Sequence, residues 1–191
     1  LLKTSCVNLS KIANDLRLMA SGPRAGFGEI YLPSVQAGSS IMPGKVNPVI
    51  PEAINQIAFQ IMGNDMTITM AAQSGQLELN AFLPVIAHNL FEILDILRNG
   101  IELFIHKCIK GIKANRERCR EMVEESYVQA PALIRHIGYN EASSLAKECV
   151  AENKSLRTVI LEKKIMDSKT IDRILNPLEL TKPGIPGIEK E

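Results

Sequence analysis

The sequence predicts an all-α fold: a long-helix bundle followed by a small C-terminal helical domain. Apolar residues recur every three or four positions over most of the 191 residues, which is the spacing of one face of an α-helix. No segment shows the strict alternation of apolar and polar residues that marks a half-buried strand. Glycine and proline gather where the periodic segments end, as expected of turns between helices.

The first two periodic segments lie on either side of a loop at residues 36–47. The first covers about the first twenty residues, and Gly22-Pro23 ends it. For the helix after the loop, we expect Asn47 as the N-cap and Pro48 as the first residue, because these residue types favour those positions. The two expected apolar faces are Ile12, Leu16 and Met19, and Ile50, Ile54, Ile57 and Ile61.

Residues 82–112 carry the clearest helical periodicity. At about 1.5 Å per residue, a single helix over this range would be about 45 Å long. Its apolar face is broader than one neighbouring helix would cover, so we expect a bundle completed by other subunits. The face consists of Phe82, Ile86, Leu90, Ile93, Leu97, Ile101, Phe104, Cys108 and Ile112.

Shorter helices are predicted beyond residue 136, with Ser155 and Ser168 as helix caps. We therefore expect three parts: residues 1–135 as part of the central bundle domain, residues 136–180 as the small domain, and residues 181–191 as a tail.

Composition excludes several classes of function. The net charge is +1, from 22 basic and 21 acidic residues, which predicts no nucleic-acid partner. No apolar run reaches the length of about 20 residues that a membrane span needs. The three histidines and four scattered cysteines lack the spacing of metal ligands. We expect a reduced, cytoplasmic protein with no metal site and no membrane contact.

The loop at residues 36–47 has the composition of an anion site. Gly38-Ser39-Ser40 and Pro43-Gly44 permit backbone angles at which successive amide N–H groups converge. Lys45 and the N-terminus of the following helix add positive potential. A phosphate-binding P-loop is excluded, because five residues separate Gly38 from Gly44 and Val46 follows Lys45. On spacing alone, ordinary turn and capping chemistry remains an alternative.

The segment GSSIMPGKVNP at residues 38–48 resembles the signature of the aspartase/fumarase superfamily. The resemblance continues through MGND at 62–65, GQLELN at 75–80 and HIGY at 136–139, and covers essentially the whole chain. Within the superfamily, NPVIPEAINQ, AAQSGQLELN and NPLELTKPGI are more similar to aspartate ammonia-lyases than to class II fumarases.

This resemblance implies reversible elimination of ammonia from L-aspartate to give fumarate. It implies that Ser39 is the catalytic base and that the resulting aci-carboxylate is held at the site. Glu52 would be the charge-relay partner of a histidine from another segment. The implied substrate-binding residues are Ser40, Met42, Lys45 and Asn47.

The resemblance also implies a homo-oligomer, with a tetramer expected for the full-length enzyme. The chemistry would need no cofactor, and activation by a divalent metal is left open. Since the chain resembles only the C-terminal portion of such subunits, we expect it to be inactive alone. The alternatives are a class II fumarate hydratase and an oligomerisation or bundle fragment without activity.

Overall fold

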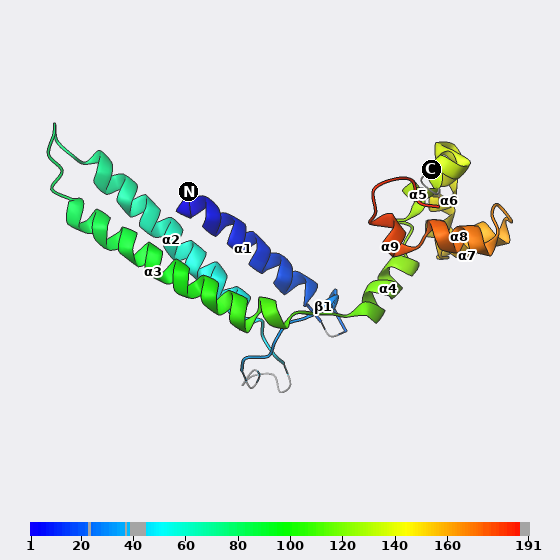
Figure 1. Cartoon of the computed structure of the whole chain (residues 1–191), viewed down its shortest axis with the longest axis horizontal. Helices are drawn as coiled ribbons and strands as arrows, with labels where there is room; N and C mark the ends of the chain where they lie inside the picture. The colour runs from blue at the N-terminus through cyan, green and yellow to red at the C-terminus, as the bar shows by residue number, and fades with distance from the viewer. Residues whose placement is uncertain (23, 37, 39–44, 188–191) are drawn as a thin grey trace. The chain divides into compact units, whose positions relative to one another are not determined.

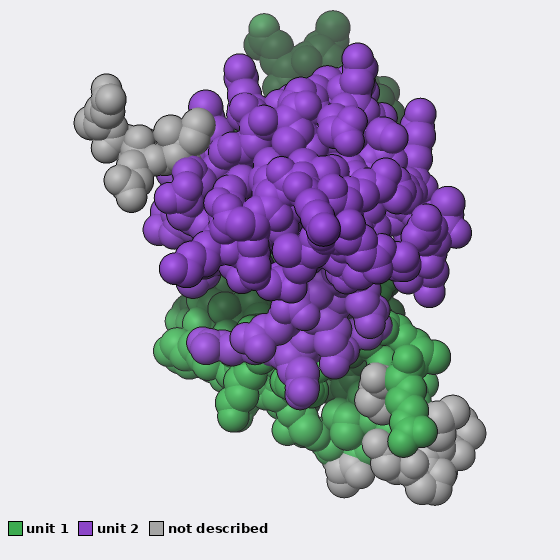
Figure 2. Space-filling model, turned by 90° about the vertical axis from the view of Figure 1, so that its right-hand side faces the viewer, with its two compact units in different colours: residues 1–115 green, residues 116–191 purple. Residues whose placement is uncertain are grey.

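The computed structural model describes residues 1–22, 24–36, 38 and 45–187. The chain divides into two compact units, residues 1–115 and 116–191, which Figure 2 shows in different colours. Within these units the described residues are overwhelmingly helical (Figure 1), so the predicted all-α class is confirmed. Among the described residues, no helix is long and apolar enough to cross a membrane.

Three helices form the first unit: α1 (Leu2–Met19), α2 (Val49–Gln73) and α3 (Leu83–Lys107). Helix α2 lies between the other two and packs along both (Figure 1). The apolar face predicted for residues 50–61 is confirmed, because Ile54 and Ile61 are buried in the contacts. The face predicted for the first helix is only partly right: Leu16 is buried, but Ile12 is 46% exposed and Ala13 takes the buried position.

Helix α3 is shorter than predicted. It ends at Lys107, since Cys108 leaves the helical region with φ −130° and ψ −68°. One 3₁₀ turn, η1 (Ile109–Gly111), follows. At about 1.5 Å per residue, the 25 residues of α3 span about 37 Å rather than 45 Å. The apolar periodicity continues through Ile112 although the helix does not, because the chain after Lys107 still packs against the same core.

A short β-ladder, which the sequence analysis did not predict, joins the segment after α1 to the segment after η1. Strand β1 (Ile30–Tyr31) pairs antiparallel with β2 (Lys113–Ala114). The pairing is extended by Asn115, whose backbone N–H donates to the Glu29 carbonyl at 2.8 Å and whose side-chain amide donates to the Gly28 carbonyl at 2.9 Å. Strands of two residues are too short to show a period of two in the sequence.

The second unit is built from short helices around its own apolar core. Leu133, Leu145, Ile160, Ile171 and Ile174 are completely buried there. The helices are α4 (Arg116–Glu124), α5 (Ala130–Ile137), α6 (Tyr139–Glu152), α7 (Leu156–Glu162), α8 (Ser168–Ile174) and α9 (Pro177–Leu180).

The division between the units falls at residues 115 and 116, twenty residues before the boundary expected from the sequence. The reason is that Ala130 and Leu133 of α5 belong to the core of the second unit. Of the two predicted caps, Ser155 is confirmed, because its hydroxyl accepts from the Thr158 N–H at 3.2 Å. Ser168 is wrong: the cap of α8 is Asp167, whose carboxylate accepts from the Thr170 N–H at 3.0 Å.

Candidate functional site

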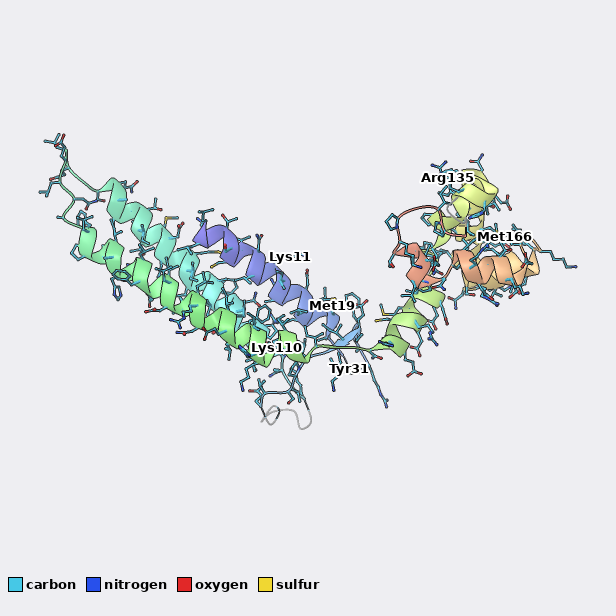
Figure 3. The ribbon with its side chains drawn as sticks, in the orientation of Figure 1. Lys11, Met19, Tyr31, Lys110, Arg135 and Met166 are labelled. Atoms are coloured by element: carbon cyan, nitrogen blue, oxygen red, sulfur yellow. The ribbon has the colours of Figure 1, made fainter. Side chains whose placement is uncertain are left out.

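The candidate loop at residues 36–47 lies in the chain between β1 and α2. The C-terminal ends of α1 and α3 and the N-terminal end of α2 meet there around a shared core that includes Leu16, Ile54 and Cys108. Figure 3 shows Met19, Tyr31 and Lys110, from α1, β1 and η1, at this same end. Residues 30–36 lead from the β-ladder into the loop, and residues 45–48 lead out of it into α2.

The two ends of the loop lie against each other. Gly38 has φ +101°, in the region that favours glycine, and a β-carbon on it would lie 3.2 Å from the Lys45 carbonyl oxygen. The chain therefore enters the loop and leaves it at nearly the same place. The predicted site residues Ser39, Ser40 and Met42 lie outside the described residues.

Lys45 and Asn47, two of the predicted substrate-binding residues, immediately precede α2. Lys45 is exposed and Asn47 is half-buried. The predicted N-cap is wrong: Pro48 with φ −79° and ψ 62° is the N-cap, and α2 begins at Val49. The Asn47 carbonyl oxygen accepts from the Val49 N–H at 2.9 Å. Lys45 and Asn47 thus lie at the positive end of a 25-residue helix, where the backbone favours an anion.

Glu52 lies in the first turn of α2, where a carboxylate complements the helix dipole. One of its oxygens, Oε1, is 3.6 Å from Nη2 of Arg17, in the last turn of α1. The two side chains are 36% and 40% exposed. An ion pair this exposed contributes only about 0–1 kcal/mol to stability.

Arg17 and Asn55 are polar residues near the site that the sequence analysis missed. Asn55 is 4% exposed, and its side-chain amide donates to the backbone and hydroxyl oxygens of Ser10 at 3.1 and 2.9 Å. Its own Oδ1 accepts from Nη1 of Arg17 at 3.2 Å. The available signal was an asparagine within the apolar face of residues 50–61, since a polar residue at a core position needs partners.

Cys108 lies beneath this end of the unit and is 1% exposed. Burial raises the pKa of its thiol. A raised pKa keeps the group as the thiol, which is a poor nucleophile at neutral pH. No group of three or more His, Cys, Asp or Glu side chains among the described residues is arranged to hold a metal ion.

Comparison with known families identifies the class of protein. The family described as "Lyase" matches residues 1–63, and the family described as "Fumarase C C-terminus" matches residues 130–182. A structure titled fumarate lyase:delta crystallin from Brucella melitensis bound to cobalt has a TM-score of 0.90 and 49% sequence identity, over 95% of this chain and 39% of that one. The chain belongs to the aspartase/fumarase superfamily.

Within that superfamily, the chain matches the C-terminal portion of aspartate ammonia-lyases. It is 52% identical to the Bacillus subtilis aspartate ammonia-lyase over 98% of this chain and 40% of that protein. It is 49% identical to the Helicobacter pylori aspartate ammonia-lyase over 95% of this chain and 39% of that protein. The chain therefore spans about two fifths of the length of these relatives.

Proposed function

We propose that this chain is the C-terminal portion of an aspartate ammonia-lyase subunit, which eliminates ammonia from L-aspartate to give fumarate. The observation that carries the proposal is the 52% identity to the Bacillus subtilis enzyme over 98% of the chain. The matched region includes the loop at residues 36–47, whose ends meet at the N-terminus of α2.

In the proposed reaction, Ser39 acts as the alkoxide, and its Oγ takes a proton from the carbon of aspartate that lies beside one carboxylate and does not carry the amino group. The electron pair of that C–H bond moves into the carboxylate, which becomes a doubly charged aci-carboxylate. The pair then returns to form the double bond of fumarate while the C–N bond breaks and ammonia leaves. Lys45 and Asn47 stabilise the aci-carboxylate, with donors from Ser40 and Met42. Glu52 partners a histidine from another segment.

The energetic requirement explains why a whole loop is needed. A hydroxyl is a weak base at neutral pH, and each unit by which its pKa must fall corresponds to about 1.4 kcal/mol. One helix terminus supplies only about 0.3–1 kcal/mol when exposed. Several preorganised donors, each contributing about 3 kcal/mol, supply enough. The proposed chemistry requires no cofactor.

A class II fumarase is the second candidate. One of the two matching families is described as "Fumarase C C-terminus". A class II fumarase from Schistosoma mansoni has a TM-score of 0.87 and 38% identity, over 95% of this chain and 38% of that one. Such an enzyme adds water rather than ammonia to the double bond of fumarate. The higher identity to aspartate ammonia-lyases favours ammonia.

A product assay separates the two candidates. The test protein is a full-length subunit that contains these residues, or a chimaera in which they replace the matching segment of the Bacillus subtilis enzyme. It is incubated with fumarate, with and without ammonium, and aspartate and malate are quantified. We expect aspartate only when ammonium is present. Malate formed at equal rates in both mixtures would identify a fumarase and overturn the proposal.

We also propose that the full-length enzyme is a homo-oligomer, with a tetramer as the expected state. Large apolar side chains are exposed along α2 and α3, including Phe59, Met66 and Leu94 at 62%, 56% and 46%. Several large apolar side chains exposed along two neighbouring helices favour an association surface. Light scattering of the full-length protein measures the state directly, and a stable monomer would contradict the proposal. Without that association and without activity, the chain would be a bundle fragment only.

A further inference from the structure

The Arg17 side chain is held by a buried anchor that also fixes its direction. The amide nitrogen of Asn55 donates to Ser10, at 3.1 and 2.9 Å from its carbonyl and hydroxyl oxygens. The amide oxygen therefore faces the guanidinium, and Nη1 of Arg17 donates to it at 3.2 Å. Flipping the amide would place an NH₂ group against the guanidinium, which has no acceptor. The orientation of Asn55 is thus set from both sides.

The same guanidinium reaches Glu52 from the neighbouring helix. Nη2 of Arg17 lies 3.6 Å from Glu52 Oε1, while Nη1 is also 3.5 Å from Asn14 Oδ1. Glu52 and Asn55 are three residues apart, so they lie on the same side of α2 and face α1 together. A planar guanidinium is suited to bridging two such oxygens, because its N–H groups diverge in a fixed plane.

The third nitrogen of the guanidinium takes no part in these contacts. Arg17 Nε is buried and has no hydrogen-bond partner among the described residues. An unpartnered donor on a charged group is unfavourable, and an ion pair as exposed as the one with Glu52 contributes little to stability. The geometry that leaves Nε without a partner is the one that aims Nη2 at Glu52.

We propose that Arg17 is a positioning residue, which holds the carboxylate of Glu52 at the beginning of α2 in the direction that the reaction requires. This inference rests on the role proposed above for Glu52 as the partner of a histidine. Arg17 does not touch the substrate. It acts by restricting the rotation of Glu52, whose side chain is 36% exposed and otherwise has several rotamers available.

Steady-state kinetics of variants in the full-length or chimaeric enzyme test this inference. We expect Arg17→Met to lower kcat about 10- to 100-fold with little change in KM, because a misdirected catalytic partner impairs turnover rather than binding. Arg17→Lys should fall between Arg17→Met and the unchanged enzyme, since an ammonium group lacks the fork that bridges two oxygens. Arg17→Lys keeps the charge, so it remains informative even when Arg17→Met fails to assemble.

A double-mutant cycle separates positioning from a structural role. If Arg17 acts through Glu52, adding Arg17→Met to Glu52→Gln should lower kcat no further than Glu52→Gln alone. Losses that multiply would overturn the inference. Arg98→Met is the matched control, because Arg98 also lies 3.6 Å from a glutamate, Glu102, and both side chains are exposed. We expect this control to leave kcat unchanged.

The outcomes also distinguish this inference from the proposed function. A loss of kcat in Glu52→Gln but not in Arg17→Met would overturn the role of Arg17 only. An unchanged kcat in both variants would remove the proposed role of Glu52, and with it the basis of the inference. Thermal unfolding of each variant shows whether any loss of turnover merely follows a loss of folded protein.

Discussion

Pro33 and Gly111 are in direct contact, so closely that a β-carbon on Gly111 would lie 2.4 Å from Pro33 Cγ. Gly111 ends the 3₁₀ turn after α3, and Pro33 follows strand β1 on the way into the loop at residues 36–47. The contact therefore fixes the path of the chain into the proposed catalytic loop. The adjacent β pairing of Ile30 with Ala114 holds the same two segments together.

Gly111→Ala should destabilise the chain by about 1–3 kcal/mol, because the added methyl group overpacks a ring that cannot rotate away. In the full-length enzyme it should also lower kcat by displacing the loop. The measurements are denaturant unfolding of this chain and turnover of the enzyme.

Gly63→Ala is the matched control for that substitution. Gly63 lies within α2, and a β-carbon on it would meet nothing within 4 Å. This change should stabilise the chain by about 0.5–1 kcal/mol, since alanine is the better helix former. Equal effects of the two substitutions would show that the contact with Pro33 is not tight.

The sequence predicted the parts of the fold that repeat over many residues. The face of α2 was predictable because buried residues recur there at every third or fourth position. The face predicted for α3 is only partly right: Ile93 and Phe104 are buried, but Leu90 and Ile101 are 39% and 36% exposed. The end of α3 was not, because Cys108 and Ile112 keep the apolar period while the backbone turns away at Cys108. Long-range contacts such as Gly111 with Pro33 leave no local signal in either segment.

The candidate site shows the same division. Its loop and the residues Lys45, Asn47 and Glu52 were found from composition and resemblance, because they are close together in the sequence. Arg17 was missed, because its relation to Glu52 spans two helices. The helix start was misplaced by one residue, since an asparagine followed by proline suits both an N-cap and the position before one.

Low pH should destabilise the second unit, in part through protonation of Asp167. Hydrogen bonds from the side chain and backbone of Thr170 lower the pKa of Asp167. Its contribution to stability is therefore present above the unfolded pKa of about 3.9 and is lost as the pH falls through the lower folded value. Lys154 lowers the pKa of Glu152, and Arg157 lowers the pKa of Asp172. The stability that these two carboxylates contribute is therefore also lost as the pH falls.

Asp167→Asn isolates this effect, because asparagine also caps helices well but does not ionise. We expect the variant to lose less stability than the unchanged chain between about pH 5 and about pH 2. The measurement is thermal unfolding at several pH values in that range. Identical pH profiles for the two proteins would show that the carboxylate of Asp167 does not contribute.

The 191-residue chain should be inactive alone. The histidine that Glu52 would partner is expected from another segment. The family resemblance implies that a threonine directly precedes this histidine, whereas Ala87, Ile105 and Arg135 precede the chain's own three histidines. Purified chain incubated with L-aspartate should give no fumarate absorbance above a blank. Production of fumarate at a rate comparable to that of the full-length enzyme would show that the 191 residues contain a complete site.

The role of Ser39 as the base is tested most directly by turnover of Ser39→Ala in the full-length or chimaeric enzyme, with binding of aspartate measured in parallel. Ser34→Ala is the control, because Ser34 is an exposed serine two residues before the same loop, where its hydroxyl donates to the Gln36 carbonyl at 3.1 Å. We predict that Ser39→Ala lowers kcat about 10²- to 10⁴-fold while aspartate still binds, and that Ser34→Ala has little effect. Near-normal turnover in Ser39→Ala would contradict the account.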